Sequence, residues 1–175
     1  TVMNVASATS DGSYKVGTII DVTMTFSEAV IVTGTPQLIL ETGTTDRLAN
    51  YGSGSGTSML TFTYTVQAND NIGDLGSVDT SSLGLNGGTI KDAAGNDAVN
   101  TLANDFTAAN AVIVDTTAPT VSSDDITTAD GSYKAGQAIT FTVTYSENVI
   151  VNTAGGTPYL ALNMGGRQAA YASGS

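Results

Sequence analysis

The sequence predicts an all-β protein built from β-sandwich units in tandem. Several segments of the 175 residues alternate apolar residues with Thr, and clusters of Gly, Asn, Asp and Ser separate these segments. A third observation is an internal repeat, because the run Asp11–Lys15 recurs as Asp130–Lys134, an offset of 119 residues. No segment has the periodicity of a convincing helix.

The clearest strands are predicted where the alternation has a period of two. Apolar residues occupy every second position from Ile20 to Phe26, with Asp or Thr between them, and segments 60–66 and 139–145 have the same pattern. Such a segment is typical of a strand with one buried face. Shorter strands are expected at Pro36–Glu41, Leu48–Gly52, Leu83–Leu85 and Ala111–Asp115, with turns at Ser53–Gly56, Asn69–Gly73, Asn86–Gly88 and Asp92–Asp97.

About seven short strands in roughly 100 residues, with turns at regular spacing, favour an immunoglobulin-like Greek-key β-sandwich. Further matches between the two copies support a repeat. Phe26–Glu28 corresponds to Tyr145–Glu147, Gly34–Pro36 to Gly156–Pro158, and Tyr51–Ser55 to Tyr171–Ser175.

The boundary between the units is predicted in the segment 115–119, where Pro119 stiffens the chain. Residues 1–117 are therefore expected to form a complete repeat, and residues 118–175 the N-terminal part of a second, truncated repeat. The second copy has no counterpart of the 60–66 segment, so a sandwich without its later strands would leave an apolar face bare.

The composition excludes several classes of function. Sixteen acidic and five basic residues give a formal net charge of −11, which disfavours nucleic acids and anionic lipids as partners. The chain has no Cys and no His, so it can form no disulfide, Ser-His-Asp triad or Cys-His pair, and we expect no enzymatic activity. No run approaches the roughly 20 apolar residues of a membrane helix, so membrane insertion is not expected.

The motifs also resemble those of a known family. Four runs of the chain, in their order and spacing, resemble the bacterial Ig-like tandem repeats of giant secreted adhesins: Asn86–Asn96, Asp115–Val121, Asp130–Lys134 and Ser146–Glu147. The resemblance covers essentially the whole chain. It implies a location outside the cell or on the bacterial surface, adjacent repeats of the same chain as partners, and calcium that stiffens the array.

Calcium is also the cofactor that the acidic residues suggest, because a hard divalent cation with oxygen ligands offsets clustered carboxylates. If the sandwich has Ig topology, Asp115 and Glu147 meet at a junction between repeats, with Asp70 or Asp74 nearby. The alternative is that Asp and Asn only cap turns with their side chains. The candidate metal ligands are Asp11, Glu28, Asp70, Asp74, Asp92, Asn96, Asp97, Asp115, Asp130 and Glu147.

The leading hypothesis for function is therefore a structural spacer module of an extracellular adhesin. Two alternatives stay open at this point. One is a module whose loops bind a glycan or a surface. The other is a subunit of an extracellular filament, in which a neighbouring chain completes the second unit by adding strands to its edge.

Overall fold

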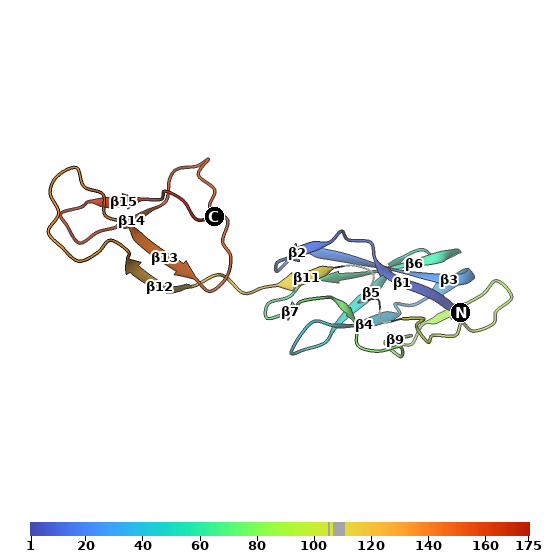
Figure 1. The fold of residues 1–175 in the computed structure, drawn as a ribbon. Coiled ribbons are helices and arrows are strands. Elements are labelled where there is room, and N and C mark those ends of the chain that lie inside the picture. The colour runs from blue at the N-terminus through green and yellow to red at the C-terminus, as the bar shows by residue number, and fades with distance from the viewer. Residues whose placement is uncertain (105, 107–110) are drawn as a thin grey trace. The chain divides into compact units, whose positions relative to one another are not determined.

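The computed structural model describes residues 1–104, 106 and 111–175. The chain forms two compact units, Thr1–Thr117 and Ala118–Ser175, and each is described below by itself. Within the described residues every regular element is a strand (Figure 1), so the all-β prediction is confirmed. Accordingly, the described part of the chain contains no helix that could span a membrane.

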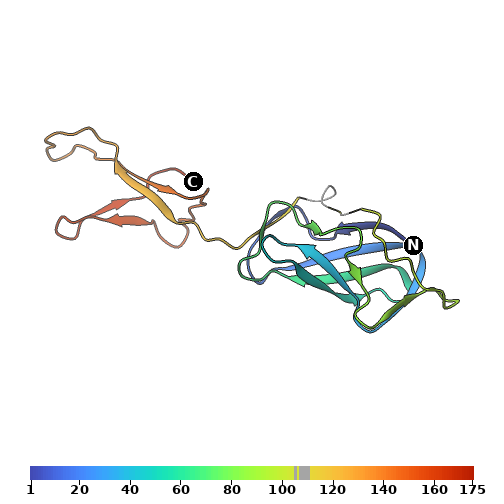
Figure 2. The same ribbon diagram turned by 90° about the horizontal axis from the view of Figure 1, so that it is seen from below.

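The first unit is dominated by an antiparallel sheet in the strand order β1-β3-β6-β5-β4-β8. Figure 2 shows its long strands running side by side. Two further short strands extend it, since β9 pairs with β4 and β10 pairs with β3. The bounds are β1 Val2–Ser7, β3 Ile19–Thr33, β4 Gln37–Glu41, β5 Arg47–Ser53, β6 Thr57–Thr65, β8 Gly76–Ser77, β9 Leu83–Gly84 and β10 Thr89–Lys91.

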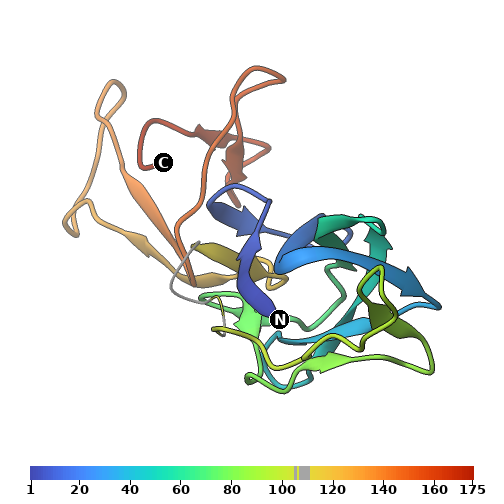
Figure 3. The ribbon, with the colours of Figure 1, turned by 90° about the vertical axis from the view of Figure 1, so that its right-hand side faces the viewer.

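A second, three-stranded sheet completes this unit. Its central strand is β11 (Val112–Asp115), which pairs parallel with β2 (Gly12–Tyr14) and antiparallel with β7 (Asn71–Ile72). Seen from its N-terminal end, the strands of the first unit curl around a common interior (Figure 3).

The predicted alternation decides which side chains fill that interior. The apolar residues at every second position of β3 and β6 are buried, and the Thr residues between them point to the other face. The rings of Tyr51 and Phe62 add an edge-to-face contact with centroids 6.2 Å apart. The largest fully buried side chains are Tyr64, Phe62, Phe106, Ile20, Met24, Leu38, Leu40, Leu60, Leu75, Ile90, Val5 and Val22.

One predicted strand is longer than expected. The strand predicted to end at Phe26 continues to Thr33, because its second half finds a different partner. Residues 19–25 pair with β6, the register then shifts, and residues 31–33 pair with β10. Glu28 therefore lies in the irregular middle of a strand, and not in a loop after it.

The second unit contains β12 (Val121–Ile126), β13 (Phe141–Tyr145), β14 (Tyr159–Ala161) and β15 (Gln168–Ala170). They form two separate antiparallel pairs, β12-β13 and β14-β15. The β12-β13 register matches that of β1-β3 position by position: Val121 faces Tyr145 as Val2 faces Phe26, and both pairs have an irregularity at the next residue. Likewise β14-β15 has the pairing of β4-β5.

The two units differ in how deeply equivalent residues are buried, and one pair of variants tests this. Ile20 of the first unit is fully buried, whereas Ile139, at the same place in the second, is exposed. Ile20→Ala is expected to lower the free energy of unfolding by about 3 kcal/mol, because it leaves a cavity in a packed core. Ile139→Ala, the matched control, should cost less than about 1 kcal/mol.

Urea denaturation of the full chain, followed by circular dichroism, measures both values. Equal losses for the two variants would contradict the difference in packing between the units.

Candidate functional site

Four of the predicted metal ligands gather at one hollow of the first unit. Glu28, Asp92, Asn96 and Asp97 line a depression of about 200 Å³, together with Thr1, Val30, Ala98 and Val99. The pairing of β10 with the second half of β3 brings them together, because the turn 92–97 follows β10 directly and Glu28 lies in β3. A backbone bridge between Lys91 and Asp97 closes this turn.

Within the turn, Asp92 and Asn96 hold each other. The Asp92 carboxylate accepts hydrogen bonds from the backbone N–H of Asn96 at 2.8 Å and from its side-chain amide at 2.7 Å. The side-chain and then the backbone hydrogen bond of Asn96 lower the pKa of Asp92 below its ordinary value. Gly95 has a positive φ of 92°, which favours glycine at this place in the turn. Asp92 and Asn96 therefore cap this turn with their side chains, which is the role that the sequence left open as the alternative to metal binding.

Asp97 has a cationic partner of its own. The Nζ atom of Lys91 lies 2.6 Å from Asp97 Oδ1. Both side chains are exposed, and exposed ion pairs of this kind contribute only about 0 to 1 kcal/mol. A cation in solution would compete with Lys91 for this carboxylate at little cost in stability.

The oxygen donors around the hollow suit a hard cation in chemistry but are not arranged as a cage. Three carboxylates and one amide oxygen are the ligand types that calcium prefers. However, among the described residues no three His, Cys, Asp or Glu side chains are close enough to hold a metal ion together. Calcium binding here would require the carboxylates to come closer together, and Asp97 to leave Lys91.

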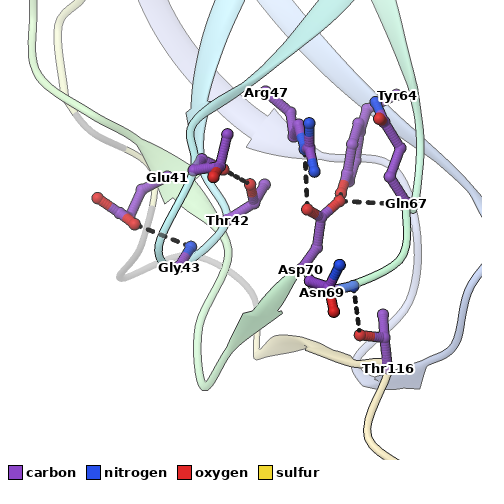
Figure 4. Close-up of polar contacts among 10 residues, drawn as sticks. Glu41, Thr42, Gly43, Arg47, Tyr64, Gln67, Asn69, Asp70 and Thr116 are labelled. Carbon is purple, nitrogen blue, oxygen red and sulfur yellow. Dashed lines mark hydrogen bonds and ion pairs between the residues drawn. The ribbon is translucent and has the colours of Figure 1, made fainter.

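A fifth candidate, Asp70, is buried in a network of its own (Figure 4). Its side chain is 1% exposed. Arg47 Nε donates to Asp70 Oδ1 at 2.8 Å, while the Tyr64 hydroxyl and the Gln67 backbone N–H, the latter at 2.9 Å, donate to Oδ2. Both carboxylate oxygens are therefore used by protein donors, so the structure gives Asp70 a structural role.

The same contacts shift the pKa values of the network. Burial is the largest single influence on Asp70 and opposes its ionisation, but the hydrogen bonds from Tyr64, Arg47 and Gln67 outweigh it and lower the pKa. For Tyr64, burial raises the pKa, and the bond to the Asp70 carboxylate raises it further. The network thus holds a carboxylate charged beneath the surface of the unit.

Sequence reasoning missed Arg47 and Tyr64 as partners of Asp70. The alternation in segment 60–66 predicts only that Tyr64 lies on the buried face of a strand. One signal was available, because Arg47 is the only Arg among residues 1–117, and a single guanidinium in an acidic chain suits a specific carboxylate.

The remaining candidates in the first unit are spread over its loops and last strand. Asp115 Oδ1 accepts from the Thr117 backbone N–H at 3.0 Å, and Asp11 Oδ1 accepts from that of Ala111 at 3.1 Å. Asp74 Oδ1 is buried without a hydrogen-bond partner among the described residues. None of these three carboxylates lines the hollow that contains Glu28.

Two candidates belong to the second unit. Glu147 follows β13 at the position of Glu28, and Asp130 is exposed at the position of Asp11. A junction formed by Asp115 and Glu147 would combine residues of both units, so the junction hypothesis stays a prediction.

Comparisons with protein-family models, with curated proteins and with solved structures found no match for this chain. The resemblance to bacterial Ig-like adhesin repeats therefore stays a prediction from the motifs.

The role of Asp70 can be tested by its pH dependence. Folding lowers the pKa of Asp70, so its contribution to stability is complete above its pKa in the unfolded chain, about 3.9, and is lost as the pH falls through the lower folded value. Asp70→Asn should lower the free energy of unfolding by about 2 to 3 kcal/mol at pH 7. The difference from the parent chain should stay constant above about pH 5 and shrink below about pH 4.

Chemical denaturation at a series of pH values provides the measurement. Asp46→Asn is the matched control, because Asp46 is exposed and adjoins Arg47. A pH-independent difference for Asp70→Asn would show that the charge of Asp70 does not matter.

Proposed function

We propose that this chain is a structural spacer module of an extracellular bacterial surface protein, built from Ig-like units in tandem. The observation that carries the proposal is the common register of β1-β3 and β12-β13, displaced by 119 residues. Two segments that pair in the same way in separate compact units support a repeated unit. In a repeat array, each unit adds length and contacts only its neighbours.

The strand order supports an Ig-like Greek-key topology for this unit. In an Ig sandwich the first, second, fifth and fourth strands lie in that order in one sheet. The long strands β1, β3, β6 and β5 have this order in the first unit. The unit departs from the simple pattern because β5 also pairs with β4, which makes the sheet continuous around the interior.

We further propose that calcium stiffens the array. The net charge of −11 and the carboxylates of Glu28, Asp92 and Asp97 around one hollow support a site for a divalent cation. Asp115 and Glu147 remain the candidates for a second site, at the link between units.

Calcium should raise the melting temperature of the full chain. A ligand that binds only the folded state stabilises it by mass action, so calcium at about five times its Kd contributes about 1 kcal/mol. For a domain of this size that corresponds to a rise of about 4 °C. Differential scanning calorimetry in millimolar calcium, with magnesium and with NaCl of equal ionic strength as controls, measures the shift.

Two double variants locate the site. Glu28→Gln with Asp97→Asn should remove the shift if the hollow binds the ion, and Asp115→Asn with Glu147→Gln should remove it if the link does. Asp46→Asn, which removes an exposed carboxylate that is not among the candidate ligands, should leave the shift unchanged. A parent chain that melts at the same temperature with and without calcium would remove calcium from the proposal.

A further inference from the structure

The last residues of the first unit are held by more contacts than a boundary between units usually has. Segments at such boundaries are commonly exposed and make few contacts. Here Asn71 Oδ1 accepts hydrogen bonds from the Thr116 backbone N–H at 2.9 Å and from the Thr117 hydroxyl at 3.2 Å. The Asn69 backbone N–H donates to Thr116 Oγ1 at 3.1 Å. Residues 69–71, which we call the anchor loop, therefore hold both of the residues that follow β11.

The position of β11 in its sheet decides how a pull on this end of the unit is resisted. β11 lies between β2, with which it pairs parallel, and β7, with which it pairs antiparallel. The start of β1 and the end of β11 lie at opposite ends of the first unit (Figures 1 and 2). A pull between these two ends therefore acts along β11. Because the hydrogen bonds between strands run across the strand direction, such a pull loads them together and does not open them one at a time.

The anchor loop is itself attached to the large sheet of the first unit. Its central residue, Asp70, accepts from Arg47 at the start of β5 and from Tyr64 near the end of β6 (Figure 4). The backbone N–H of Asn71 donates at 3.0 Å to the carbonyl of Thr42, the buried residue that follows β4. The loop is therefore tied to the ends of three neighbouring strands, β4, β5 and β6.

The segment that follows β4 also packs directly on the anchor loop. Gly43 has a φ of 109°, and a Cβ atom at this residue would lie 2.5 Å from the carbonyl oxygen of Asn71. The two backbones approach so closely that no side chain fits between them. The anchor loop can therefore not move toward Gly43 without displacing the end of β4.

The contacts that hold Thr116 and Thr117 lie at the surface, unlike the network beneath them. Asn69 and Asn71 are exposed, whereas Asp70 between them is buried. An exposed hydrogen bond contributes little to the free energy of unfolding, because water replaces it when it breaks. The rate of unfolding under force, by contrast, depends on the contacts that must break before the chain extends. The anchor contacts are therefore of more use to a unit under tension than to an unloaded one.

We propose that the first unit bears tension along the chain, and that the anchor loop passes the force from Thr116 and Thr117 to the ends of β4, β5 and β6. Three strands of the large sheet then share the force with the two neighbours of β11. This inference rests on the proposed function, since a spacer in a surface array is pulled when the array is attached at both ends. It does not depend on calcium.

Single-molecule force spectroscopy of the full chain tests the anchor. The chain has no Cys, so Thr1→Cys and Ala118→Cys, both at exposed residues, attach handles at these two sites alone and load the first unit. At constant force, Asn71→Ala should raise the unfolding rate about 10-fold, since it removes two hydrogen bonds on the path of the force. The matched control, Asn50→Ala, removes an exposed side-chain hydrogen bond with Gln37 outside the anchor and should change the rate less than about 2-fold.

A second pair of handles separates force transmission from a purely structural role. With Thr1→Cys and Thr44→Cys, the force enters through the exposed loop after β4 and bypasses residues 116–117. Asn71→Ala should then change the unfolding rate less than about 2-fold. Contacts that only stabilise the fold would instead give the same acceleration with both pairs of handles.

Thr116→Val provides an independent check, because it keeps the shape of the side chain and removes the oxygen that accepts from Asn69. It should also speed unfolding only when the force enters at residue 118. Equal acceleration with both pairs of handles, or none with either, would overturn the inference. So would a variant that no longer folds without force, since the contacts would then serve folding. A chain that calcium stabilises but whose unfolding under force is independent of Asn71 keeps the proposed function and loses this inference.

Discussion

The pairing of β6 with β3 on one side and β5 on the other is the contact on which the first unit depends. It places Leu60, Phe62 and Tyr64 in the centre of the interior, and the remaining strands pack around them. Apolar side chains of this size each contribute about 1.5 to 3 kcal/mol when they are fully buried. The second unit contains equivalents of the strand pairs β1-β3 and β4-β5, which flank β6 in the first unit. Apolar residues of these equivalents, such as Val121 and Leu160, are exposed.

A single buried carboxylate fixes the loop that leaves this central strand. Asp70 lies just beyond β6, and its bonds to Tyr64 and Arg47 tie the loop to the end of β6 and the start of β5. A charged group is stable there only because every oxygen has a donor and one donor is a guanidinium. The chain then continues into β7, which pairs with the last strand of the unit. The network thus sets the path from the large sheet to the small one.

The sequence predicted the parts of the fold that depend on local pattern. The alternation of apolar residues with Thr is sufficient to find β6 and the first half of β3, because each has one buried face. It could not find the second half of β3 or the short strand β10, since these pair over a long separation and have little alternation of their own. For the same reason the strand was predicted to end at Phe26, which would leave Glu28 beyond it. Asp70 was predicted to lie in a turn and to be a candidate metal ligand, because its partners, Arg47 and Tyr64, are distant in sequence.

The repeated motifs have a clear physical role, because they supply the local hydrogen bonds that fix strand pairing. Ser27 and Ser146 each accept from the backbone nitrogen of the residue that faces them, Thr1 and Thr120. Tyr14 and Tyr133 each donate to the carbonyl four residues earlier, at Ser10 and Ala129. The β12-β13 pair therefore has the register of β1-β3 although its apolar residues are exposed. The same local polar contacts accompany this strand pairing in both units, whereas the apolar faces are buried only in the first unit.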